Sequence, residues 1–318
     1  MEDVANIGMW VGFSVFLVFA LSIDTFFSGK HYARPHESMQ ASLTWTLVWV
    51  TTALLFNGFL WVYLYSTTTL AIANEKSLQF LTGYLIEKSL SVDNLFVFFM
   101  IFHQFHIPLV SQQRVLTIGI WSAIVMRLVM ILLGVWLVSQ FHWLLYLMGA
   151  FLVVTGIKMC FLQDRHPDLA DSLTIRCLKR IVRITNKLHE QHFFIRQDFR
   201  LYATPLFVVL VLVEISDLIF ATDSIPAIFA ITRDPFIIWS SNIFAILGLR
   251  ALYFLLAKMV HRFELLKYGI ALILVFIGGK MMLEPWLVIP VMLVLGVIAG
   301  ILAFFVSLSW LLSAKRRA

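Results

Sequence analysis

Apolar windows of about 20 residues recur along almost the whole chain, and each is long enough to cross a bilayer as a helix. Short polar breaks, and one longer break, separate these windows. We therefore predict an all-α polytopic membrane protein with about nine transmembrane helices. The predicted helices start near Ile7, Thr44, Ser77, Val115, Phe141, Leu201, Phe236, Phe263 and Trp286.

Composition supports the membrane class and leaves no room for a soluble catalytic domain. Hydrophobic residues make up 61% of the 318 positions, charged residues make up 13%, and the mean hydropathy is +0.90. Globular domains are typically about 45–50% apolar and about 25% charged. Ile7 to Phe27 follow a leader with Glu2 and Asp3, so we expect a retained first helix instead of a cleaved signal peptide. Residues 1–318 are predicted to form a single transmembrane domain.

Lysine and arginine gather on alternate loops, and this distribution predicts the orientation of the helices. With the N-terminus outside, the outside loops carry little basic charge beyond Lys76 and Arg233. We therefore expect the C-terminus in the cytoplasm. The positive-inside rule accounts for the net charge of +6 without nucleic acid as a partner. Cys160 and Cys177 fall near the inside face, where we expect free thiols.

Two stretches of the chain resemble each other and indicate an internal repeat. Residues 141–159, "FHWLLYLMGAFLVVTGIKM", align without gaps on residues 263–281, "FELLKYGIALILVFIGGKM". The helix predicted before each stretch carries a lone arginine at mid-depth, Arg127 in one and Arg250 in the other. Because coincident charges inside membrane spans are difficult to obtain by chance, we interpret the two regions as copies of one unit.

The helix before each arginine carries acids at matching positions. "EKSLSVDN" places Glu87, Asp93 and Asn94 where "DLIFATDS" places Asp217, Asp223 and Ser224. Each copy has three helices, and an odd number makes the second copy enter the membrane from the opposite side, as in inverted-repeat transporters. The predicted parts are two peripheral N-terminal helices (1–76), repeat 1 (77–162), a basic cytoplasmic segment (163–200), inverted repeat 2 (201–284), and the last helix with a basic tail (285–318).

Helix geometry spreads these side chains over about a third of each helix surface. Six residues turn an ideal helix through about 600°, so Glu87 and Asp93 lie about 120° apart, whereas Asn94 returns to the face of Glu87. Glu214 adds an acid three residues before Asp217. We therefore expect the acids to face a cleft within the protein instead of lipid.

Pro226, in the second acidic helix, predicts a local change in that helix. Its ring removes one amide donor and clashes with the carbonyl of Thr222, which would be left free. Broken backbone at membrane depth is tolerated only inside protein or beside a wet cavity, and such carbonyls often coordinate cations in transporters. We expect a kink or interruption close to Asp223.

Acids outnumber the deep basic residues. Five predicted acids accompany two deep arginines, Arg127 and Arg250. At roughly 2.5 to 3.5 kcal/mol per mid-helix charge, these seven groups would cost on the order of 20 kcal/mol if unpaired, which exceeds a typical folding stability. Two arginine pairs neutralise two acids, so about three carboxylates need protons, a metal ion or both. We therefore predict a cation site with Arg127 and Arg250 as charge partners.

The ligand types narrow the identity of the cation. Carboxylate, amide, hydroxyl and carbonyl oxygens suit Mg²⁺, Ca²⁺ or Mn²⁺, and no Cys or His lies in these segments to select softer metals. The ion requires deprotonated acids, so ion and protons should compete for the site. The predicted metal ligands are Glu87, Asp93, Glu214, Asp217 and Asp223, with Asn94, Ser224, Thr222 and Asp24 as further oxygen donors. Whether Asp24 and Lys88 belong to the site or border it stays open.

Three other interpretations remain. The acids could hold helices together through the two arginines, although the acids outnumber those bases. An intramembrane enzyme, hydrolytic or redox, would need a recognisable motif or axial ligand pair, and no GxGD, HExxH or GxSxG sequence accompanies the acids. A metal-sensing partner of other proteins would bind the ion without flux. We expect a transporter whose partners are the lipid bilayer, a divalent ion and protons, and no enzymatic activity.

Three stretches resemble the TerC/Alx family of integral membrane proteins: "LTGYLIEKSLSVDNLFVF", "LVEISDLIFATDSIPAIFAITRDPF" and "SNIFAILGLRALYFLLA". The likeness extends from Asp24 to Lys280, and the five acids named above match the family's acidic positions. The resemblance implies a bacterial inner-membrane protein linked to manganese export, tellurium resistance and the alkaline pH response, and related to LysE-type transporters. It also implies the alternative of a redox modulator. Mn²⁺ as the ion and export as the direction come from the resemblance alone.

Overall fold

The structure is a computed structural model that describes residues 6–31, 39–141, 143–161, 178, 182–185, 192–197, 200–257, 265–284, 286–287 and 289–315. Helices dominate this part of the chain. In order, the elements are α1 (Ile7–His31), α2 (Met39–Thr67), α3 (Leu70–Gln104), α4 (Leu109–Gln140), α5 (Leu144–Phe161), β1 (Phe194–Gln197), β2 (Arg200–Ala203), α7 (Pro205–Phe229), α8 (Pro235–Ile246), α9 (Leu249–Ala257), α10 (Leu266–Leu283) and α11 (Val291–Lys315).

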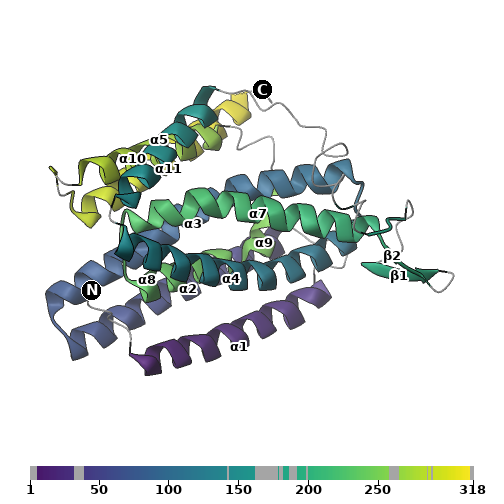
Figure 1. The fold of residues 1–318 in the computed structure, drawn as a ribbon, viewed down its shortest axis with the longest axis horizontal. Helices are drawn as coiled ribbons and strands as arrows, with labels where there is room; N and C mark the ends of the chain where they lie inside the picture. Colours follow the sequence, from purple (N-terminus) through teal and green to yellow (C-terminus); the bar gives the residue numbers. More distant parts are fainter. Residues whose placement is uncertain are drawn as a thin grey trace.

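The longest helix, α3, lies at the centre of the bundle, with α2, α7, α8, α9 and α11 packed against it (Figure 1). Its 35 residues bury polar side chains, among them Gln79, Glu87 and Asn94. In Figure 1, α5, α10 and α11 form a group on one side of the bundle, and α1 follows the opposite edge. Helices α1, α2 and α11 expose many large apolar side chains. The polar helix is therefore inside, and the apolar helices present the surface that suits lipid.

The helices confirm the predicted class, an all-α polytopic membrane protein. Within the described residues, 7 helices are long and apolar enough to cross a membrane, and the bent pair α8 and α9 could form one further span. The polar helix α3 is not among these candidate spans. Each of the predicted segments coincides with one of these helices or with the α8–α9 pair. The number of crossings and their orientation stay predictions.

Helices α8 and α9 are parts of one interrupted helix, bent by 41°. Leu247 adopts an extended conformation, and Gly248 has a φ of +79°, in the left-handed region that favours glycine. A Cβ atom at Gly248 would lie 2.6 Å from Trp49 Cδ1 of α2. The interruption therefore requires a glycine for two independent reasons, backbone conformation and close packing.

Of the predicted kink or interruption close to Asp223, the structure excludes the interruption, and the kink stays a prediction. Helix α7 runs without a break through Asp223 and Pro226 to Phe229. Pro226 lies in the last turn, so its missing amide and its ring disturb only the end of the helix. The interrupted helix of this bundle lies elsewhere, between α8 and α9.

The helices of the repeated stretches, α5 and α10, pack tightly against each other through glycine. A Cβ atom at Gly149 would lie 3.0 Å from Gly278 O, and one at Gly156 would lie 2.6 Å from Ala271 O. In the sequence alignment, Gly149 corresponds to Ala271 and Gly156 to Gly278. Exchanging the two copies therefore converts one contact into the other. An antiparallel pair related by a pseudo-two-fold axis has this property, which supports the inverted repeat at these two helices.

The predicted boundaries need two adjustments. Helix α3 begins at Leu70, after the N-cap Thr69, so the predicted boundary between residues 76 and 77 falls inside a helix. The basic segment 163–200 lies mostly outside the described residues, but its end contributes β1, which pairs antiparallel with β2 across the predicted boundary at residue 200, and an isolated bridge joins Ile184 to Ala203. We did not predict these strands. Cys160 is a free thiol as expected, and Cys177 lies outside the described residues.

Candidate functional site

A buried arginine on α4 joins the two acidic helices. The Arg127 guanidinium, 2% exposed, donates from Nη1 to Glu87 Oε1 on α3 and from Nη2 to Asp217 Oδ1 on α7, the latter at 3.3 Å. Nη1 also donates to Asn242 Oδ1 on α8 at 2.7 Å. Glu87 and Asp217 are the corresponding acids of the two predicted copies. One guanidinium therefore serves two carboxylates, and the net charge of the three groups is negative when both acids are ionised.

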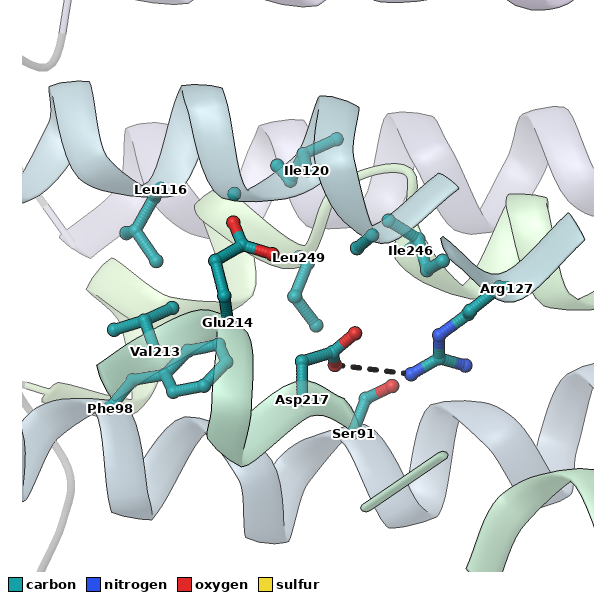
Figure 2. Close-up of a pocket in the computed structure, with 12 residues that line it drawn as sticks. Ser91, Phe98, Leu116, Ile120, Arg127, Val213, Glu214, Asp217, Ile246 and Leu249 are labelled. Carbon is teal, nitrogen blue, oxygen red and sulfur yellow. Dashed lines mark hydrogen bonds and ion pairs between the residues drawn. The ribbon is translucent and has the colours of Figure 1, made fainter. Parts of the chain in front are cut away.

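A small cavity lies against this network (Figure 2). Glu214 and Asp217 reach it from α7, Ser91 from α3 and Arg127 from α4. In Figure 2, Asp217 points toward Arg127, whereas Glu214 points toward α4, where the Ser122 hydroxyl donates to its carboxylate. The rest of the described wall is apolar: Phe98, Leu116, Gly119, Ile120, Ala123, Val213, Ile246 and Leu249. The acids therefore share a confined and mostly apolar space, where an ionised group needs a nearby counter-charge.

The acids at the second motif position do not line this cavity in the described part of the chain. Asp93 is half-buried on α3, and Asn94 beside it is buried. On α7, Asp223 Oδ1 is buried without a hydrogen-bond partner in the described residues, although Thr155 of α5 contacts the carboxylate. Ser224 Oγ is also buried and without a described partner. Buried polar atoms normally have a hydrogen-bond partner, so these two atoms could bind a donor or a cation near the second motif.

Thr222 points away from the predicted site. Its side chain is exposed, and its hydroxyl donates to the Ile219 carbonyl at 2.6 Å. A hydroxyl that bonds back to its own helix is a common arrangement for Ser and Thr inside helices. The structure therefore does not bring this predicted oxygen donor together with the acids.

The second deep arginine has a different partner from the one predicted. Arg250 on α9 is 1% exposed and donates from Nη2 to Asp24 Oδ2 on α1 at 2.6 Å. Its Nη1 donates to Thr117 Oγ1 on α4 at 2.7 Å. Arg250 therefore binds Asp24, which belongs to neither acidic motif. Asp24 does not line the cavity that holds Glu214 and Asp217. This pair connects the outer helix α1 to the interrupted helix.

The five predicted metal ligands do not converge on one point in this arrangement. Among the described residues, no group of three or more His, Cys, Asp or Glu side chains is close enough to hold a metal ion. Arg127 lies between Glu87 and Asp217 and occupies the space between two of the predicted ligands. A divalent ion bound by both carboxylates would require the guanidinium to move. The predicted metal site stays a prediction.

The sequence did not lead us to predict three polar side chains of these networks. Asn242 binds Arg127, Ser122 binds Glu214, and Thr117 binds Arg250. A signal was present for Asn242, which follows two serines inside an apolar window. Ser122 and Thr117 are single hydroxyls on α4 without a distinctive pattern. Only the packing of α4 against α7 and α9 gives them partners.

The fold and the site define a polytopic helical membrane protein whose bundle encloses a network of carboxylates and arginines. Residues 72–318 match the family described as "Integral membrane protein TerC family". The chain therefore belongs to the TerC family, and the resemblance drawn from its acidic motifs is confirmed.

Similar proteins cover the chain almost from end to end. A protein of Escherichia coli strain K12 named "Putative membrane-bound redox modulator Alx" is 50% identical over 311 residues, which are 98% of this chain and 97% of its own length. A Shigella flexneri protein with the same name has the same identity and coverage. An uncharacterized membrane protein of Myxococcus xanthus is 42% identical over 301 residues, 94% of this chain and 91% of its own. No solved structure gives a significant match.

Proposed function

We propose that this protein transports a divalent metal cation, and that it exports Mn²⁺ across the cytoplasmic membrane in exchange for protons. The observation that carries the proposal is the shared guanidinium: Glu87 and Asp217 bind one arginine, and Glu214 lines the same cavity. When all three acids are ionised, two negative charges in a mostly apolar space remain without a counter-charge. A cation or protons must neutralise them, because a buried, unpaired carboxylate is strongly unfavourable.

Oxygen ligands favour hard divalent ions. Carboxylates with hydroxyl and amide oxygens are the donor set that suits Mn²⁺, Mg²⁺ or Ca²⁺. In the proposed cycle the cytoplasmic ion displaces Arg127 from one carboxylate, and Arg127 returns when the ion leaves. On the outer side, protons would bind the acids and release the ion. The guanidinium then acts as an internal counter-charge that keeps the empty transporter from holding unpaired acids.

The tight antiparallel packing of α5 and α10 also supports transport. In transporters with inverted repeats, one copy rocks against the other around a site near the bilayer midplane. The exchange symmetry of Gly149 with Gly278 and of Gly156 with Ala271 is the contact pattern expected where two such copies meet. The acids on α3 and α7 would then lie on the two copies, and relative movement would expose them to alternate sides.

Flux into lipid vesicles tests the proposal directly. The purified chain is reconstituted, Mn²⁺ is added outside, and entry is followed with an encapsulated dye that Mn²⁺ quenches. We expect saturable entry that Glu214→Gln and Asp217→Asn strongly reduce, while Glu284→Gln, a change at an exposed acid, transports like the parent. In cells that overload with manganese, the first two variants should fail to restore growth. Equal flux by all variants, at equal protein levels, would overturn the proposal.

The names of the Escherichia coli and Shigella flexneri relatives favour a second candidate, a membrane-bound redox modulator. A visible absorption spectrum and elemental analysis of the purified protein separate the two. A chromophore that changes on reduction supports redox modulation, whereas bound Mn²⁺ with vesicle flux supports transport. Stoichiometric Mn²⁺ binding without flux would instead support a metal-sensing protein and would exclude a transporter.

A further inference from the structure

Lys88 follows Glu87 in the sequence but points to a different part of the bundle. Its ammonium donates to Ala245 O at 3.1 Å and to Leu247 O at 3.5 Å. Both carbonyls lie where α8 ends, before the chain resumes as α9. Among the described residues, no carboxylate pairs with Lys88, which is part-buried in the middle of α3. The structure thus places a cation against backbone carbonyls and not against an acid.

Helix interruption explains why these carbonyls are available. The last carbonyls of a helix have no partner within the helix, and they form the negative end of its dipole. Leu247 N donates back to Ile243 O at 2.8 Å, and the left-handed Gly248 then turns the chain away. The carbonyls beyond Ile243 are therefore available to other donors, and two of them, Ala245 O and Leu247 O, accept hydrogen bonds from Lys88.

The carbonyl site is held in place without the lysine. Trp49 packs against Gly248, so the backbone at the turn has little room to move. Before the turn, Asn242 accepts a hydrogen bond from Arg127, and after it Arg250 is bound to Asp24. The interruption is fixed on both sides by contacts that do not involve Lys88.

Free carbonyls at the C-terminal end of a broken helix coordinate Na⁺ in several transporters. We propose that Lys88 is a built-in monovalent cation: its ammonium fills a carbonyl site at the end of α8 that would bind free Na⁺ or a small alkylammonium ion if the side chain were absent. The chain therefore keeps this site occupied independently of the ions around it. The inference concerns binding and stability, and it holds whether or not the acids carry Mn²⁺.

Thermal unfolding of the purified full-length chain tests this site. The midpoint Tm of the parent, Lys88→Ala and Lys88→Met is measured in NaCl, methylammonium chloride and N-methyl-D-glucamine chloride at equal ionic strength. The last cation is too large for the site. We expect the parent to have one Tm in all three salts. Lys88→Ala should unfold earlier in N-methyl-D-glucamine, and Na⁺ or methylammonium should raise its Tm saturably by about 2–4 °C.

Two comparisons separate ion binding from a general salt effect. In Lys88→Met, the methionine side chain would nearly match lysine in length and leave no room for an ion, so this variant should be destabilised in all three salts alike. Lys158→Ala removes an exposed lysine and should behave like the parent. Lys88→Ser replaces Lys88→Ala if the latter does not accumulate in membranes. A Tm of the small variant that is the same in every salt, or an equal Na⁺ effect on all variants, would overturn the proposal.

Discussion

Glu87 and Asp217, which lie 130 residues apart in the sequence, accept hydrogen bonds from the same guanidinium, that of Arg127. The two acids occupy corresponding positions in the two predicted copies. Neither acid is neutralised by an arginine of its own, because the second deep arginine binds Asp24. When both acids are ionised, the group of Glu87, Asp217 and Arg127 therefore carries a net negative charge, which a bound cation would neutralise.

Arg127 should be the side chain whose loss most destabilises the bundle. In Arg127→Gln, Glu87 would stay fully buried without its counter-charge, and breaking a buried pair in this way costs about 3–5 kcal/mol. We expect a large fall in Tm of the purified protein and reduced accumulation in membranes. Arg233→Gln is the matched control, since Arg233 pairs with Glu284 at the surface and such pairs contribute about 1 kcal/mol or less. Equal Tm values for the two variants would contradict this account.

Asp217→Asn should separate transport from stability. An asparagine has the shape of aspartate, and its Oδ1 can still accept the hydrogen bond from Arg127, while Glu87 continues to pair with that arginine. We expect Mn²⁺ flux to fall at least about tenfold, the equivalent of about 1.4 kcal/mol, with a small change in Tm. Glu284→Gln, an exposed acid, serves as the control. Parental flux by Asp217→Asn would remove this residue from the proposed site.

The crossing of α5 and α10 should depend on Gly278. A Cβ atom there would lie 2.5 Å from Gly149 O and 2.9 Å from Val153 N, so Gly278→Ala must push the helices apart. Overpacking of this kind costs about 1–3 kcal/mol, which we expect as a lower Tm. Gly279→Ala is the control on the neighbouring position, because its Cβ would meet nothing within 4 Å and alanine favours a helix. The prediction fails if the two variants unfold at the same temperature.

Proton competition gives the proposed transporter a defined pH dependence. Mn²⁺ binds deprotonated carboxylates, so its binding releases protons, and its affinity should strengthen as the pH rises from about 6 to about 8. Calorimetric titration in buffers of different ionisation enthalpy would measure both the affinity and the number of protons released. Asp217→Asn should release fewer protons than the parent. An affinity that is constant over this range would argue against exchange of Mn²⁺ for protons at these acids.

Much of the fold followed from the hydrophobic pattern. Each predicted helix exists, because a membrane-length apolar window has few stable alternatives to a helix. Boundaries and interruptions were less predictable. Pro226 led us to predict a kink or interruption close to Asp223, yet the proline lies in the last turn and the helix is not interrupted. The actual interruption depends on Gly248, whose left-handed conformation and contact with Trp49 leave no trace in a hydropathy pattern.

Sequence alone determined the class of the protein, the matched acidic motifs and the surplus of acids over deep arginines, because periodicity, spacing and charge are all local properties of the chain. Tertiary structure decided which charges meet. It assigned Arg127 to Glu87 and Asp217, Arg250 to Asp24, and Lys88 to the carbonyls at the end of α8. Those assignments depend on which helices pack together and on how a side chain turns from its helix, and residues far apart in sequence determine both.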